Sequence, residues 1–131
     1  MKKILLNGLI LGAITGAVNA VLALTLGGSV LATPFQPNTT EQIATSEFAG
    51  AAFGASLILT LIGALILGLL HRSLGARGVR IWTIIGIAFL VLYGLFPFLA
   101  PGMASSKAAI MVNIMHLVAG IPALTYLPKK L

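Results

Sequence analysis

Residues 47–70 read EFAGAAFGASLILTLIGALILGLL, an apolar run whose one charged side chain is Glu47 at its first position. At a rise of about 1.5 Å per residue, a helix of this length crosses the roughly 30 Å hydrocarbon core of a bilayer. The basic segment HRSLGARGVR at residues 71–80 follows, and residues 81–99, IWTIIGIAFLVLYGLFPFL, form another apolar run of spanning length. Two spans joined by a short basic hairpin predict an antiparallel pair of transmembrane helices.

Two further apolar runs flank this pair. Residues 4–30 and 108–127 are each long enough to span a bilayer as a helix. The segments between the runs, residues 31–46 and 100–107, contain proline, glycine and polar side chains, which are typical of loops. We therefore expect residues 1–131 to form a single domain, an all-α integral membrane protein whose four transmembrane helices pack as an up-down-up-down antiparallel bundle.

Composition excludes a soluble protein. Apolar residues make up 59% of the chain and charged residues 8%, and the mean hydropathy of +1.10 lies far from soluble norms. The net charge of +6 comes from basic residues at the ends of the apolar runs, so it indicates membrane topology and predicts no nucleic-acid partner. The chain has no cysteine, which excludes disulfides, thiolate metal sites and cysteine nucleophiles.

A signal peptide is the alternative interpretation of the first run. Lys2 and Lys3 resemble its basic n-region, and Val30, Leu31 and Ala32 resemble a small-residue cleavage site. However, the run is roughly twice the length of the usual signal-peptide core, and glycine recurs through it. We therefore expect an uncleaved first span.

The basic residues predict the orientation of the bundle, because lysine and arginine in short loops stay on the cytoplasmic side of a membrane. In a four-span arrangement, Lys107 and both acids, Glu41 and Glu47, fall on one side. All other basic residues fall on the opposite side: Lys2, Lys3, Arg72, Arg77, Arg80, Lys129 and Lys130. We therefore expect a multi-pass protein of the plasma (inner) membrane with both termini cytoplasmic.

Small residues at four-residue spacing predict where helices approach closely, because helices in lipid associate largely through backbone packing. The predicted packing residues are Gly8, Gly12, Gly16 and Ala20 on the first span, and Gly50 and Gly54 on the second. Packing within the bundle and contact between subunits both explain such stripes, and the sequence does not separate them.

A few polar side chains fall near the centre of the membrane, where polar groups are costly and therefore candidates for function. Asn113 and His116 are three residues apart, so they share a helix face. The cluster serves either as a hydrogen-bond network between helices or as a ligand-binding or proton-carrying site centred on His116. The candidate ligand-binding residues are His116, Asn113, Asn19, Ser56 and Tyr93, with Thr60 at similar depth.

These residues do not match the haem-binding, proton-coupled export or catalytic sites that are known in membrane proteins. A bis-histidine haem needs two histidines at similar depth, and His71 lies about a dozen residues from the midpoint of its span, too far from His116. The small multidrug resistance exporters use a glutamate embedded in the first helix, and this chain has no acid there. No nucleophile is paired with a base. We expect a protein that is not an enzyme, without catalytic residues, cofactors or bound metal.

The basic hairpin indicates contact with lipid. Arg72, Arg77 and Arg80 lie with His71 at the inner boundary of the membrane. Each basic residue there contributes roughly 1 kcal/mol of attraction to anionic headgroups. We therefore expect the three arginines to contact anionic lipid.

Two short segments resemble a known family. They are GAVNAV at residues 16–21 and MHLVA at residues 115–119, the latter followed by Pro122. Together they resemble small four-span bacterial membrane proteins that are grouped as a domain of unknown function, in which an asparagine in the first helix and a methionine-histidine-leucine step in the last recur. The resemblance implies a four-span architecture and a bacterial plasma membrane, singles out Asn19 and His116, and implies no activity.

Together these features predict a packing, accessory or oligomer-forming subunit that has no chemistry of its own. Its expected surroundings are the lipid bilayer and either further copies of itself or a larger membrane-protein partner. The alternative is a protein that binds or transports a small molecule or lipid at a polar site around His116.

Overall fold

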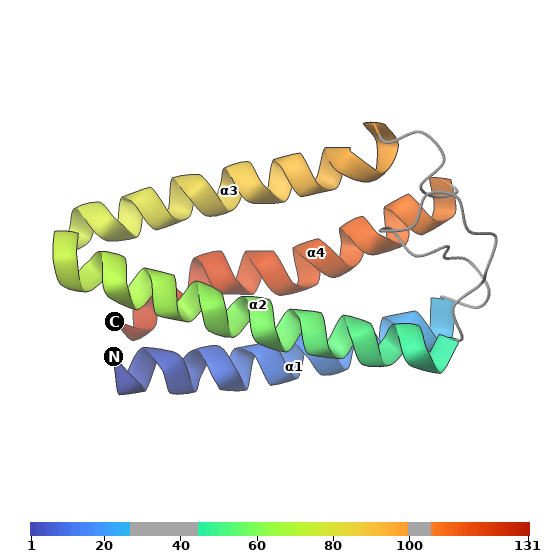
Figure 1. Ribbon diagram of the computed structural model, residues 1–131, viewed down its shortest axis with the longest axis horizontal. Helices are drawn as coiled ribbons and strands as arrows, with labels where there is room; N and C mark the ends of the chain where they lie inside the picture. Colours follow the sequence, from blue (N-terminus) through green and yellow to red (C-terminus); the bar gives the residue numbers. More distant parts are fainter. Residues whose placement is uncertain (27–44, 100–105) are drawn as a thin grey trace.

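The computed structural model describes residues 1–26, 45–99 and 106–131 of the chain. These residues form four α-helices and a short 3₁₀ turn: α1 (Lys2–Leu26), α2 (Thr45–Leu74), α3 (Ala76–Leu99), α4 (Ser106–Tyr126) and η1 (Leu127–Lys130). Consecutive helices run in opposite directions, and the N- and C-termini lie at the same end of the bundle (Figure 1). The predicted all-α, antiparallel four-helix architecture is confirmed.

All four helices are long and apolar enough to cross a membrane. The spanning segments run Lys2–Thr25, Thr45–Leu74, Ala76–Leu95 and Ile110–Lys130. Large apolar side chains such as Ile14 and Leu92 point outward, with 57% and 67% of their surfaces exposed. Such a surface suits lipid and not water. The protein is therefore a multi-pass membrane protein.

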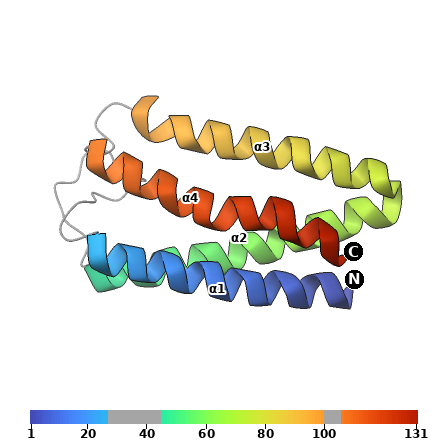
Figure 2. The same ribbon diagram turned by 180° about the vertical axis from the view of Figure 1, so that it is seen from behind.

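The helices are not equally buried. Figures 1 and 2 show α2 and α4 in the middle of the bundle, with α1 and α3 on opposite sides. One third of the residues in the spanning segments of α1 and α2 are buried (33% each), against 6% in α3. The core consists of two small clusters, around Met111 and Met115 towards one end and around Leu67 and Leu127 towards the other. Of the four spanning helices, α3 is therefore the least buried.

The glycine stripe of α1 packs on α2. A Cβ atom built on Gly12 would lie 3.0 Å from both the Cα and the carbonyl oxygen of Leu57, and one on Gly16 would lie 2.9 Å from the carbonyl oxygen of Phe53. Gly8 faces Ala64 in the same way. The absence of side chains at these positions is what lets the two helix backbones touch.

The second predicted stripe, on α2, has no such helix contact within the described residues. No atom of the described residues falls within 4 Å of a Cβ built on Gly50 or Gly54. Ala51 and Ala55, beside these glycines on α2, are exposed. We call these four residues the α2 patch. It is a smooth surface that nothing in the described part of the chain covers.

The structure differs from expectation at the basic hairpin of residues 71–80, which is almost entirely helical. Gly75 alone separates α2 from α3. It has a φ of 55°, the left-handed conformation that commonly ends helices, and its N–H donates to the His71 carbonyl at 2.8 Å. Hydropathy locates the edge of the hydrocarbon, whereas a helix continues into the headgroup region, where its charged side chains are solvated.

The connections between α1 and α2 and between α3 and α4 lie largely outside the described residues. Residues 27–30 of the expected first span, most of the loop expected at residues 31–46, and residues 100–105 lie outside the described residues. Where the described chain resumes, residues 45–46 and 106–107, expected in loops, are the first residues of α2 and α4.

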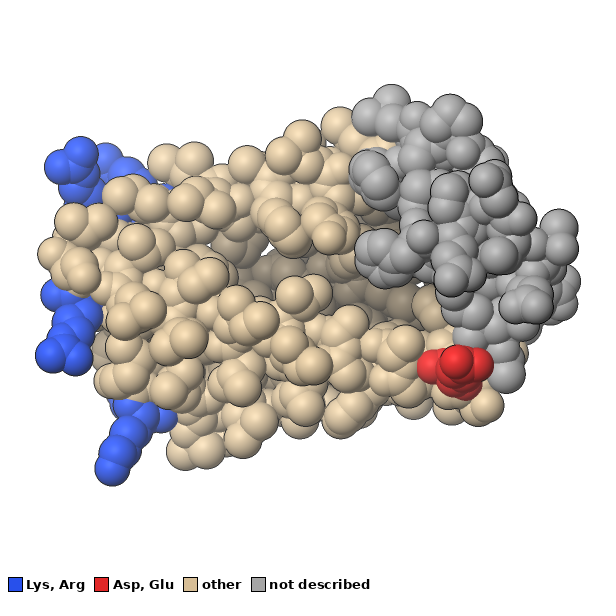
Figure 3. Space-filling view, in the orientation of Figure 1, with Lys and Arg blue, Asp and Glu red and all other residues tan. Residues whose placement is uncertain are grey.

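Charge divides the two ends of the bundle. The blue lysine and arginine side chains gather at the end that holds the termini, and a red acidic side chain lies at the opposite end (Figure 3). The described acid is Glu47, in the first turn of α2. The charge asymmetry on which the predicted orientation rests is therefore present in the folded bundle.

Candidate functional site

Asn19 joins three helices near the middle of the bundle. Its side-chain amide donates to the Ser56 hydroxyl of α2 at 2.9 Å and to the Met115 carbonyl of α4 at 3.1 Å. Ser56 donates in turn to the Ala52 carbonyl of its own helix at 2.8 Å. Only 2% of the Asn19 surface is exposed. Because a buried amide in lipid must find its partners within the protein, this side chain fixes how α1, α2 and α4 meet.

Asn113 forms the corresponding link between α4 and α3. Its amide donates to the Gly94 carbonyl at 3.0 Å, and the absence of a side chain at Gly94 leaves room for this approach. The same seam has two interlocked contacts, in which Leu124 packs on Gly86 and Leu90 packs on Gly120. The face of α4 that carries Asn113 and Gly120 is thus directed at α3.

His116 meets an aromatic side chain of α3. Its ring lies edge-on to Tyr93, with centroids 5.3 Å apart, and Tyr93 stacks on Phe89 at 4.5 Å. His116 is half-buried. Its Nδ1 atom is buried and has no hydrogen-bond partner within the described part of the chain. The imidazole is therefore able to accept or donate one further hydrogen bond.

Three aromatic side chains share one face of α3, which the rest of the bundle covers only in part. Trp82 rests on Gly63 of α2, where a Cβ would lie 2.8 Å from the indole ring. Phe89 and Tyr93 follow Trp82 by seven and eleven residues, so they lie along the same face of the helix. They are nevertheless 50% and 42% exposed. Figure 3 shows a hollow between α3 and α2, which we call the α2–α3 groove.

The structure divides the predicted polar cluster into two parts. Asn19 and Ser56 are bonded to each other in the contact between α1, α2 and α4. Asn113, His116 and Tyr93 belong to the contact between α3 and α4. Thr60 is buried, with 4% of its surface exposed. The acceptor carbonyls of Met115 and Gly94 have no signal in the sequence, because every residue has a carbonyl and only the packing selects which one is used.

The predicted lipid-contacting arginines are exposed and lie near the hairpin. Arg72 is in the last turn of α2, and Arg77 and Arg80 are in the first turns of α3. Arg72 also lines a cavity at this end of the bundle, together with Lys3, His71 and Lys130. Sequence reasoning placed Lys3 and Lys130 on the same side of the membrane but did not bring them to one cavity.

The polar groups of the two clusters are amides, hydroxyls and one imidazole. Among residues 1–26, 45–99 and 106–131, no three histidine, aspartate, glutamate or cysteine side chains gather where they would hold a metal ion. Amides and hydroxyls at such positions bind helices together or orient a polar group of a ligand.

Comparison with known proteins identifies the family. Neither the curated proteins nor the solved structures contain a match to this chain. The sequence profile of a family of unknown function, DUF6069, matches residues 3–130. This match confirms the resemblance carried by residues 16–21 and 115–119 and extends it over nearly the whole chain. The protein, whose described residues include four helices of spanning length, therefore belongs to DUF6069, a family of unknown function.

Proposed function

We propose that this protein is an oligomer-forming membrane subunit without chemistry of its own, and that two copies meet through the α2 patch. The observation that carries the proposal is the unequal use of the two glycine stripes. Gly8, Gly12 and Gly16 contact α2 of the same chain, whereas no other described helix contacts Gly50 or Gly54. Small residues at four-residue spacing on a lipid-facing helix promote close helix pairing, and soluble and membrane oligomers commonly pair identical surfaces.

The polar side chains support the same role. Asn19 and Asn113 donate their amide hydrogens to neighbouring helices of the same chain. Their bonds define the geometry of one subunit and leave the α2 patch as an apolar contact surface. A subunit of this kind works by its shape, in a homo-oligomer or beside a larger membrane protein of the plasma membrane.

Cysteine cross-linking tests the proposal, because the chain has no cysteine of its own. In membranes treated with a mild oxidant, Ala55→Cys in the α2 patch is expected to form a disulfide-linked species of twice the 13.5 kDa chain mass. Ala88→Cys on α3 is the matched control, because Ala88 is also small and exposed. Adding Gly54→Ile to the Ala55→Cys chain should abolish the link. Equal cross-linking at both positions would contradict the proposal.

A second function is favoured by a separate observation, the α2–α3 groove. Phe89 and Tyr93 are partly exposed aromatic side chains of α3, and His116, which contacts Tyr93, has a buried nitrogen without a described partner. An amphipathic lipid or small molecule would place its apolar part against these rings and its polar group against the imidazole. In this alternative the protein binds or transports that molecule.

Native mass spectrometry of gently extracted protein distinguishes the two functions. Ligand binding predicts a mass adduct that is lost in His116→Leu and kept in Leu117→Ala, a change on the exposed side of α4. Dimers without an adduct, unaffected by His116→Leu, support the oligomer-forming subunit.

A further inference from the structure

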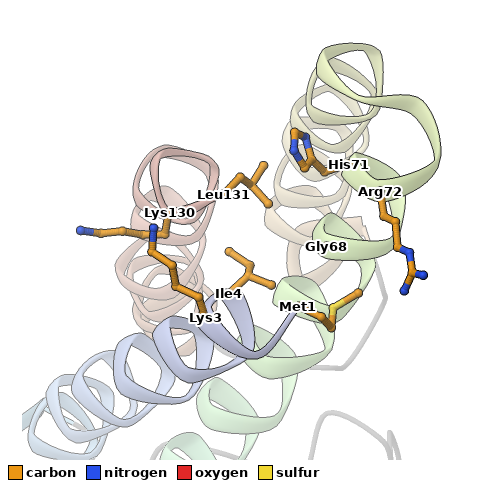
Figure 4. Close-up of a pocket in the computed structure, with 8 residues that line it drawn as sticks. All are labelled: Met1, Lys3, Ile4, Gly68, His71, Arg72, Lys130 and Leu131. Carbon is orange, nitrogen blue, oxygen red and sulfur yellow. The ribbon is translucent and has the colours of Figure 1, made fainter.

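A cavity of about 430 Å³ opens at the end of the bundle that holds the termini. Three parts of the chain line it: the start of α1, the last turns of α2 and the C-terminal residues after α4. Figure 4 shows Lys3 and Lys130 on one side of the cavity, and His71 and Arg72 of α2 on the other. The cavity therefore exists only when the two ends of the chain pack on α2.

The lining of the cavity carries positive charge without an acidic side chain. Lys3, Arg72 and Lys130 are three cations that line the cavity, and Figure 4 shows the charged ends of Arg72 and Lys130 pointing away from each other. The chain has two acids, Glu41 and Glu47, and Glu47 lies at the opposite end of the bundle, in the first turn of α2. An anion on the side of Lys3 and Lys130 would be attracted by both ammonium groups.

Lys130 is positioned by contacts of its own. Its ammonium lies 4.6 Å from the centroid of the Tyr126 ring, a cation–π distance. The Tyr126 hydroxyl donates to the side-chain carbonyl of Asn7 in α1 at 3.3 Å. The lysine is half-buried. These contacts reduce the freedom that a surface lysine must lose when it binds a ligand.

The remaining lining is apolar and continues into the spanning segments. Ile4 is 3% exposed, and Gly68 is so close to the first turn that a Cβ there would lie 2.9 Å from the Met1 sulfur. A cationic rim beside an apolar wall, at the end of a membrane span, matches a phospholipid, which joins a phosphate to hydrocarbon. We propose that this cavity binds the phosphate of an anionic phospholipid headgroup on the side where Lys3 and Lys130 lie together.

Charge-matched variants separate this site from the general attraction of a basic surface. Lys3→Gln with Lys130→Gln removes two cations from the cavity, and Arg77→Gln with Arg80→Gln removes two from the same end outside it. Each full chain is titrated in detergent with phosphatidylglycerol or phosphatidylcholine of the same acyl chains, and bound lipid is counted by native mass spectrometry. Inorganic phosphate is added in a further arm.

We expect the unaltered chain to bind phosphatidylglycerol in preference to phosphatidylcholine, without displacement by inorganic phosphate. The Lys3 and Lys130 pair should lose affinity about thirtyfold, or roughly fivefold per cation, and the arginine pair should stay within about twofold. Equal losses in the two pairs would overturn a discrete site. Equal binding of the two lipids would overturn headgroup recognition, and displacement by inorganic phosphate would reassign the cavity to a soluble phosphate compound. Unchanged helical circular dichroism shows that a variant is folded.

Discussion

At the scale of single residues, the glycines of this bundle differ in what faces them. Gly12 and Gly16 face the backbone of α2, at Leu57 and Phe53. Gly120 and Gly86 face the ends of leucine side chains. A leucine can change its rotamer to make room for a methyl group, whereas a helix backbone moves only if the whole helix moves. We therefore expect the glycines that face a backbone to reject a larger side chain, and the glycines that face leucine side chains to tolerate one.

Alanine at Gly12 is predicted to destabilise the bundle by about 1–3 kcal/mol, the usual cost of overpacking, because its Cβ would press on Leu57 at 3.0 Å. Gly120→Ala should cost less than half as much, since Leu90 can move aside. Gly54→Ala is the control in a detergent that keeps the chain monomeric, where no described atom outside its own helix turn lies within 4 Å of the added Cβ, and it should be neutral or slightly stabilising. Unfolding in detergent measures all three. Equal losses at Gly12 and Gly54 would show that α1 does not pack on α2 through this stripe.

The two asparagines are predicted to differ in proportion to the bonds that they donate. Asn19→Ala removes bonds to Ser56 and to the Met115 carbonyl, and we expect a loss of about 1–2 kcal/mol at the 0.6–1 kcal/mol typical of a bond between membrane helices. Asn113→Ala removes the one bond to Gly94 and should cost about half as much. Thr125→Val is the control, because its hydroxyl bonds its own helix. The same unfolding measurement ranks them, and a larger loss for Asn113→Ala would contradict this order.

At the scale of helices, the sequence predicted the positions of the spans better than it predicted where each helix ends or which helix each face contacts. Long apolar runs are visible in hydropathy, so four spans were predictable. The glycines of α1 lie against α2, whereas Gly50 and Gly54, at the same spacing, have no such contact within the described chain. Spacing shows that a helix has a smooth face, and only the relative rotation of the helices decides whether that face is used.

The candidate site was limited by the same ambiguity. Depth along the membrane placed Asn19, Ser56 and His116 at one level, and Asn19 does bond Ser56. Depth carries no information about which neighbour a face meets, so it did not separate His116 and its contact with Tyr93 from that group. The sequence therefore predicts at what depth in the membrane these side chains lie, but not which neighbouring helix each one faces.

The docking of α3 on α2 depends on Trp82, the one tryptophan of the chain. Its indole lies against Gly63, and its Nε1 atom is buried. Gly63→Leu is predicted to displace the ring towards lipid, so quenching of tryptophan fluorescence by brominated lipid should increase. Ala88→Leu on α3 is the control, because Ala88 is exposed and lies outside this contact, and it should leave quenching unchanged. If both variants behave alike, the exposure of Trp82 is not set by its contact with α2.

At the scale of the whole molecule, α3 is the least buried helix and the α2–α3 groove lies beside it. A bundle that buries so little of one helix depends on what surrounds it, either lipid or another protein. The groove follows from this incomplete burial, whereas the α2 patch and the headgroup cavity are formed without α3. The two proposed functions and the proposed headgroup binding therefore involve different surfaces: the α2 patch, the groove beside His116, and the cavity between the termini and α2.

Orientation decides which solution the headgroup cavity faces, and it is predicted by charge. Because the basic end resists translocation against the membrane potential, that end should be cytoplasmic. Ser46 and Ser73 are exposed residues in the first and last turns of α2. In intact cells, a membrane-impermeant maleimide should label Ser46→Cys at once, and Ser73→Cys only after permeabilisation. The reverse pattern would contradict the predicted orientation. Since both reporters lie on one helix and consecutive helices are antiparallel, their labelling fixes the side of both termini and hence of the cavity.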